Sequence, residues 1–183
     1  MQYALNAMIG LRGAFTNESV DSCSLAVAQY FDGGSRGNPG TAGCGAVVFF
    51  HPHDHDALRS SSSYNTTYSY LGVATNNEAE YEGLLLGLLE AYNAGVTKLN
   101  VRGDSQLVIN QLTGAYAARE PRLQRLLSLA KQMLRRFKHG TTAGHVYREM
   151  NRVADSLSND AMDAHRIDDM RPSHVIEDDP RFR

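Results

Sequence analysis

Hydrophobic residues along this chain follow two kinds of spacing. Short runs rich in Val, Ala, Phe and Tyr, bounded by glycines or polar residues, predict five strands at residues 25–31, 42–50, 69–73, 98–104 and 141–147. Apolar residues three or four positions apart predict helices at residues 75–93, 105–112, 120–137 and 151–164. Strands that alternate with helices in the second half of the chain predict an α/β fold with a mixed sheet that is partly parallel.

Four acidic residues lie at the boundaries of these elements. Asp32 ends the first predicted strand and begins a glycine-rich turn, and Asp104 ends the fourth strand. Glu80 and Asp155 lie in the first turns of two predicted helices. Each acid has an ordinary alternative, as a turn residue that bonds its own backbone, a helix cap, or an exposed acid favoured by the helix dipole.

Glu80 is the most informative of these acids. It shares a helix face with Gly83 and Gly87, three and seven residues later, and such glycines permit close packing on a sheet. A carboxylate on a packed face is costly unless a cation compensates its charge. Carboxylate oxygens without a cysteine and histidine constellation favour Mg²⁺ or Mn²⁺ over zinc. Two such ions about 4 Å apart activate water and stabilise the leaving oxygen in phosphodiester cleavage.

Composition and charge narrow the class of protein further. The chain has 183 residues, 42% of them hydrophobic, which suits one compact core, and its apolar runs fall short of the roughly 20 residues that cross a bilayer. Cys23 and Cys44 are too few for a disulfide scaffold, so we expect an intracellular protein. We expect the cytoplasm or the nucleus, with the mitochondrion as an alternative.

The net charge of −2 conceals an uneven distribution. Residues 98–140 hold nine Lys and Arg against two acids, whereas residues 155–183 hold eight acids against four Arg. A basic centre favours a polyanionic partner, although a solvated helix face gives the same pattern. We divide the chain into a flexible leader at 1–23, a catalytic domain at 24–165 and a flexible acidic tail at 166–183. Alternating histidines, His51, His53 and His55, fit either a metal site or a solvated loop.

Several motifs in order now resemble a known family. These are Asp-Gly-Gly-Ser-Arg-Gly-Asn-Pro-Gly at 32–40, Gly-Cys-Gly-Ala at 43–46, Thr-Asn-Asn-Glu-Ala-Glu at 75–80, Asp-Ser-Gln at 104–106, and the segment from His145 to Asp155. Together they look like the signatures of type 1 ribonuclease H. The resemblance implies a five-stranded mixed sheet in the order 3-2-1-4-5, with helices on both faces.

The resemblance also implies an activity and its residues. It implies two-metal-ion cleavage of the RNA strand of an RNA–DNA hybrid, with Mg²⁺ or Mn²⁺ held by the four acids, and 5′-phosphate and 3′-hydroxyl products. Asp32 would bridge both ions, Asp155 would share the ion that activates water, and Glu80 and Asp104 would share the other. Substrate contacts would come from Gly34, Ser35, Arg36, Asn38, Thr75, Asn76, Asn77 and Gln106.

Some questions stay open at this point. His145 fits a family histidine that assists product release, but it also reads as an ordinary strand residue. The loop at 51–70 has no assigned role. An inactive nucleic-acid-binding module of the same fold, a retroelement domain, and a related integrase or exonuclease are the alternatives to a cellular ribonuclease H. We expect a monomer without an obligate protein partner or membrane attachment.

Overall fold

The computed structural model describes residues 27–50, 64–164 and 171–182. Five strands form one sheet in the order β3-β2-β1-β4-β5, as the family resemblance implied. Their bounds are β1 Val27–Gly37, β2 Gly40–Phe49, β3 Tyr64–Ala74, β4 Leu99–Gly103 and β5 Thr141–His145. Strands β1, β2 and β3 pair antiparallel, whereas β4 runs parallel to β1 and to β5.

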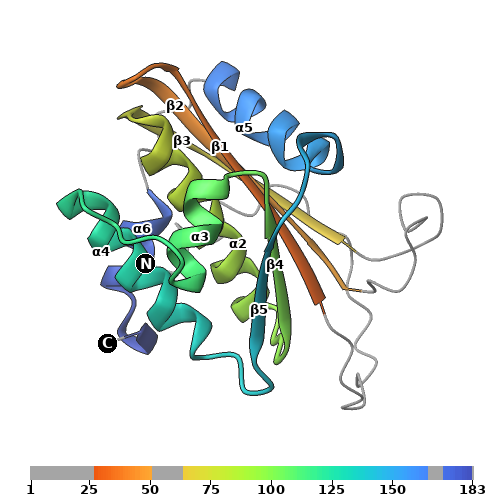
Figure 1. Ribbon diagram of the computed structural model, residues 1–183. Coiled ribbons are helices and arrows are strands. Elements are labelled where there is room, and N and C mark those ends of the chain that lie inside the picture. Colours follow the sequence, from red (N-terminus) through yellow and green to blue (C-terminus); the bar gives the residue numbers. More distant parts are fainter. Residues whose placement is uncertain (1–26, 51–63, 165–170, 183) are drawn as a thin grey trace.

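Helices cover the two faces of this sheet unequally (Figure 1). Helices α2, α3, α4 and α6 lie on one side and α5 lies on the other. Their bounds are α2 Asn76–Asn93, α3 Gln106–Thr113, α4 Pro121–Leu134, α5 Arg152–Ala164 and α6 Pro172–Asp178, with short turns η1 Arg148–Met150 and η2 Pro180–Phe182. Within the part of the chain that the structure describes, no helix combines the length and the apolar composition that crossing a membrane requires.

Helix α2 is the centre of the core. Thr75 caps it with a capping box, in which the hydroxyl accepts from the Glu78 N–H and the Glu78 carboxylate accepts from the Thr75 N–H. Its leucines then pack between the sheet and α4, and Leu84, Leu85 and Leu88 are fully buried. The capping box fixes where this helix starts along the chain, and its packing against β1 positions its first turns for the site described below.

The first strand, the third strand and the helix at 120–137 differ in length from their predictions. Strand β1 continues to Gly37 instead of ending near Phe31, because its hairpin with β2 continues through the glycines. Strand β3 begins at Tyr64 rather than 69, since its polar outer residues pair with β2 along its length. Helix α4 ends at Leu134, and a C-terminal turn leads to the buried Phe137. The leader at 1–23 and the alternating histidines lie outside the described residues.

The flexible acidic tail expected at 166–183 is wrong for the part that the structure describes. Residues 171–182 form α6 and η2, and Ile176 and Phe182 join the main core cluster. The buried carboxylate of Glu82 on α2 accepts hydrogen bonds from the Ser173 N–H and hydroxyl, 2.8 and 2.6 Å long. The acidic composition of this segment predicted a flexible tail, although Val175 and Ile176 pack in the core. The boundary between domain and tail at residue 165 otherwise stays a prediction.

Candidate active site

A step in the sheet creates the site. Parallel pairing between β1 and β4 ends at Phe31 and Gly103, whereas β1 and β2 stay paired as far as Gly37. Asp32 is therefore the first residue of β1 beyond the end of β4, in mid-strand rather than at the strand end that we predicted. Asp104 directly follows β4. The two carboxylates meet at this step.

Close backbone packing brings Glu80 to the same place. A Cβ added to Gly83 would lie 2.3 Å from the carbonyl oxygen of Asp32, and one added to Gly33 would lie 2.1 Å from the backbone of Ala79. Helix α2 and strand β1 are thus in direct backbone contact, which side chains at either glycine would prevent. The prediction that glycines let this helix face approach a sheet is confirmed.

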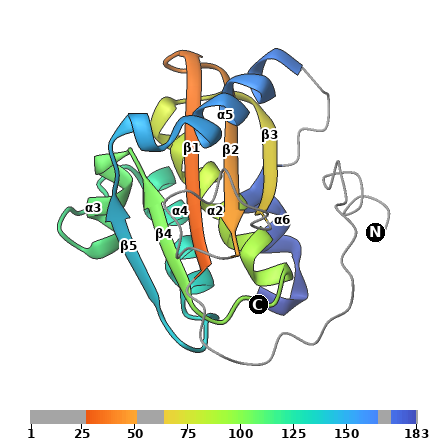
Figure 2. The ribbon, with the colours of Figure 1, turned by 90° about the vertical axis from the view of Figure 1, so that its right-hand side faces the viewer.

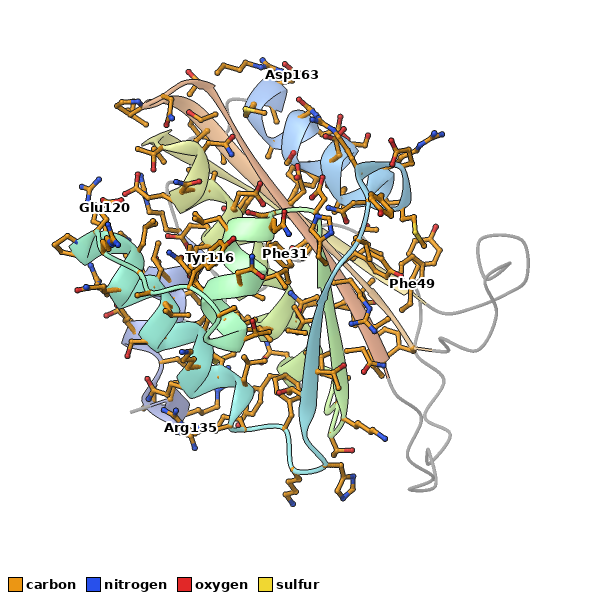
Figure 3. The ribbon with its side chains drawn as sticks, viewed as in Figure 1. Phe31, Phe49, Tyr116, Glu120, Arg135 and Asp163 are labelled. Carbon is orange, nitrogen blue, oxygen red and sulfur yellow. The ribbon has the colours of Figure 1, made fainter. Side chains whose placement is uncertain are left out.

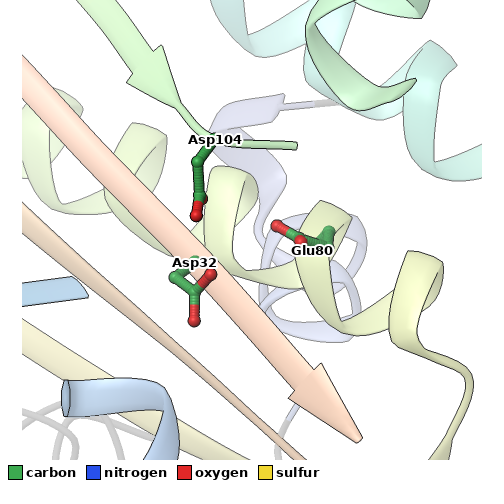
Figure 4. Close-up of side chains that lie close together, drawn as sticks. All are labelled: Asp32, Glu80 and Asp104. Carbon is green, nitrogen blue, oxygen red and sulfur yellow. The ribbon is translucent and has the colours of Figure 1, made fainter. Parts of the chain in front are cut away.

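Three carboxylates form a compact cluster (Figure 4). One oxygen from each of Asp32, Glu80 and Asp104 lies within 4.8 Å of the other two. Asp32 and Glu80 are buried, and Glu80 Oε2 has no hydrogen-bond partner among the described residues. A buried carboxylate oxygen without a partner next to two further acids is the environment that a divalent cation would satisfy.

The electrostatics of the cluster point the same way. Burial raises the pKa of Asp32, and the nearby charges of Asp104 and Asp155 raise it further. Burial and the charges of Asp32 and Asp104 raise the pKa of Glu80 well above its usual range. Full ionisation of this cluster is therefore unfavourable without a compensating positive charge, and the residues present fit a metal site.

Asp155, the fourth predicted ligand, lies near the cluster but is not part of that group. It sits in the first turn of α5, and its Oδ1 accepts a hydrogen bond of 2.6 Å from Arg148 Nη2. The same guanidinium lowers the pKa of Asp32. Arg148 thus supplies a positive charge at the edge of the site, which we did not predict because one of 18 Lys and Arg residues carries no distinguishing signal in the sequence.

Two neutral residues hold the cluster in place, and we missed both as site residues. Asn151 is buried, and its Nδ2 donates to the Phe31 carbonyl at 2.8 Å and to Asp104 Oδ1 at 2.7 Å. The Ser158 hydroxyl donates to Asp32 Oδ2 at 2.5 Å. In the sequence, Asn151 is only the first residue of the helix predicted at 151–164. These bonds tie α5 and the residue before it to the middle of β1 and to the residue after β4.

His145 is both a strand residue and a neighbour of the cluster. It is the last residue of β5, is exposed, and its Nε2 lies 3.2 Å from the backbone oxygen of Asp104. The strand interpretation is therefore correct. A part in catalysis stays a prediction.

The predicted substrate-binding residues lie on two segments near the cluster and at the start of α3. On the β1–β2 hairpin, Ser35 Oγ donates to the Ala74 carbonyl at 2.8 Å, and Asn38 Oδ1 accepts from the Asn76 N–H at 3.1 Å. These bonds connect the hairpin to the N-terminus of α2, where Asn77 is also exposed. The two segments therefore form one continuous surface.

The other predicted contacts lie around that surface. Gly34 faces α5, where an added Cβ would meet the end of Met162 at 3.2 Å, and Thr75 is occupied in the capping box. Arg36 is exposed and pairs with Asp163 at 2.6 Å. Gln106, the first residue of α3, is exposed. Substrate binding by any of them stays a prediction.

The sheet order and the acidic cluster define a domain of the ribonuclease H-like class. The model of a family described as "Reverse transcriptase-like" matches residues 30–161. The chain is similar to Ribonuclease HI of Halobacterium salinarum, with 41% identity over 137 residues, 75% of this chain and 64% of that protein. It is also similar to the Bifunctional protein Rv2228c of Mycobacterium tuberculosis, with 43% identity over 133 residues, 73% of this chain and 34% of that protein.

Solved structures similar to this chain are also of RNase H1 proteins. The RNase H1 of Halobacterium salinarum has a TM-score of 0.68 and 39% identity, over 76% of this chain and 98% of that one. LC11-RNase H1, solved in complex with an RNA/DNA hybrid, has a TM-score of 0.66 and 32% identity, over 75% of this chain and 97% of that one. This chain therefore belongs to the type 1 ribonuclease H family. It spans only about a third of the length of the mycobacterial relative.

Proposed function

We propose that this chain is an endoribonuclease that cleaves the RNA strand of RNA–DNA hybrids. The observation that carries the proposal is the cluster of Asp32, Glu80 and Asp104, with its unpartnered buried oxygen. Family membership supports a ribonuclease H activity, and the hybrid in the LC11-RNase H1 complex supports the substrate class. We also propose that the domain acts as a monomer inside the cell.

The three clustered acids and Asp155 would hold Mg²⁺, or Mn²⁺ in its place. Two bound ions would supply an activated water and stabilise the leaving 3′ oxygen, which gives 5′-phosphate and 3′-hydroxyl ends. Ser158 and Asn151 hold two of the carboxylates in fixed orientations. The hairpin backbone around Gly34 and the exposed side chains near the start of α2 would then contact ribose 2′-hydroxyls and the minor groove.

The substitution Asp32→Asn tests this proposal. The variant should lose cleavage of a labelled hybrid in Mg²⁺, while its unfolding midpoint in chelator stays the same or rises, because an amide replaces a buried acid and still accepts from Ser158. Asp160→Asn, an exposed acid on α5, is the matched control and should cleave normally. Duplex RNA and duplex DNA serve as comparison substrates in the same gel assay. Retained cleavage by the Asp32 variant would refute the assignment.

A further inference from the structure

Among the described helices, α5 alone packs on its side of the sheet, and it covers part of that face. Side chains alternate between the two faces of a strand, and Gly33 packs on Ala79 of α2, so Asp32 and Tyr30 point to the opposite side. Gly45 of β2 contacts α5 on that side. Figure 2 looks onto this face, and α5 is the one described helix that crosses it, at the end where Asp32 lies.

Beyond α5, an aromatic row crosses three strands of this face. The ring centroids of Tyr30 and Phe49 lie 5.8 Å apart in an edge contact, and those of Phe49 and Tyr64 also lie 5.8 Å apart. Phe49 lies on the α5 side of the sheet in Figure 3, whereas Phe31 lies on the side of the other helices. On the edge strand β3, Tyr64 is 54% exposed and Tyr68 is 45% exposed.

Polar and cationic groups continue the row on the other two strands. Arg102 of β4 is in register with Tyr30, and Gly144 of β5 leaves room for its guanidinium, since an added Cβ would lie 2.7 Å from Nη1. Next to it, the Thr142 hydroxyl donates to Asn100 Oδ1 at 2.6 Å. Among the described strand residues on this face, Asp32 is the one acid. We call the set Tyr30, Phe49, Tyr64, Tyr68, Asn100, Arg102 and Thr142 the open face.

We propose that the open face is a binding site for single-stranded nucleic acid, whose bases stack on its aromatic rings. Aromatic side chains with an arginine among them, on a face whose described strand residues include one acid, suit unpaired bases and their phosphates. A duplex would not fit this role, because its bases are already stacked on each other. The site is continuous with the acidic cluster, since Tyr30 lies two residues before Asp32 on the same face. A strand that passes the cluster would therefore meet the aromatic row next.

Binding can be measured without cleavage. A labelled single-stranded RNA of about twelve nucleotides, within the range of single-strand binding sites, is titrated with the full chain in chelator and followed by fluorescence anisotropy. Tyr64→Ala combined with Tyr68→Ala should weaken binding by about 25-fold or more, because each lost stacking ring removes at least about fivefold in affinity. Tyr64→Phe combined with Tyr68→Phe keeps both rings and should bind like the parent.

A matched control excludes a general effect of surface tyrosines. Tyr116 is 54% exposed, as Tyr64 is, and lies away from the open face in Figure 3, so Tyr116→Ala should leave binding unchanged. Equal binding by the parent and the double alanine variant would overturn the proposal, as would an equal loss in the Tyr116 variant. Sedimentation of the same proteins tests whether a second copy of the chain binds the open face instead. A dimer that the alanine variant dissociates would show that the face binds a second copy instead.

Discussion

Replacement of Asn151 by alanine tests how the site is held together. The side chain is 1% exposed and donates both of its amide hydrogens, to the Phe31 carbonyl and to the Asp104 carboxylate. Alanine removes the side-chain donor to this buried carbonyl, which costs about 1–3 kcal/mol. Loss of the bond to the carboxylate adds about 1 kcal/mol, since Asp104 is partly exposed and is hydrated in its place. The expected loss of unfolding free energy is therefore about 2–4 kcal/mol.

Urea unfolding in chelator measures this loss directly. Asn159→Ala is the control, because that side chain bonds a carbonyl of its own helix, Asp155, and is not part of the cluster. Its cost should stay below about 1 kcal/mol. Asn151→Asp should be worse than alanine, since an ionised carboxylate cannot donate and adds a like charge beside Asp104. Alanine within about 0.5 kcal/mol of the parent, or aspartate better than alanine, would refute this account.

Three further predictions concern the C-terminal helix, a buried acid and the ion pair at the site. Ile176→Ala should lower the unfolding free energy by about 2–5 kcal/mol in urea, because this side chain is fully buried; an unchanged midpoint would mean that α6 is not docked. Burial raises the pKa of Glu82, so the folded state binds this proton more tightly, and the resulting stability is lost as pH rises above 4.5 through the raised pKa. Glu82→Gln should therefore show a flatter dependence of unfolding free energy on pH, and equal slopes would contradict the argument. Arg148→Ala frees Asp155 and removes a positive charge, so calorimetry should show tighter Mg²⁺ binding than in the parent or in the control Arg152→Ala, and weaker binding would count against a competing ion pair.

The sequence predicted a cluster of four acids, three of which lie together in the structure, because the signals were local or came from ordered motifs. Glycines at fixed spacing around Asp32 and Glu80 record backbone contact, which no other residue permits, and the strand-helix alternation around Asp104 records the parallel pairing. The backbone contact and the parallel pairing can therefore be predicted from the residue types in one sequence. The resemblance then supplied the sheet order, which alternation alone left open.

The parts that were missed depend on long-range geometry. Asn151 acts through bonds to β1 and to Asp104, and nothing in its neighbours along the chain indicates either partner. Docking of α6 depends on Ile176 and on a serine that meets Glu82 on a distant helix, within a segment whose acids predicted a solvated tail. The exposure of Tyr64 could not be predicted either, because the pattern of a strand does not indicate which half of a sheet face a helix covers.

The docked C-terminal helix has a consequence for synthesis of the protein. Among the described residues, Val27 is the first and Phe182 the last member of one hydrophobic cluster, so the ribosome makes them about 150 residues apart. At translation rates of about 5–20 residues per second, α6 and η2 are synthesised several seconds after the leucines of α2. Until then this part of the core lacks its last members, and an incompletely buried core is prone to aggregation.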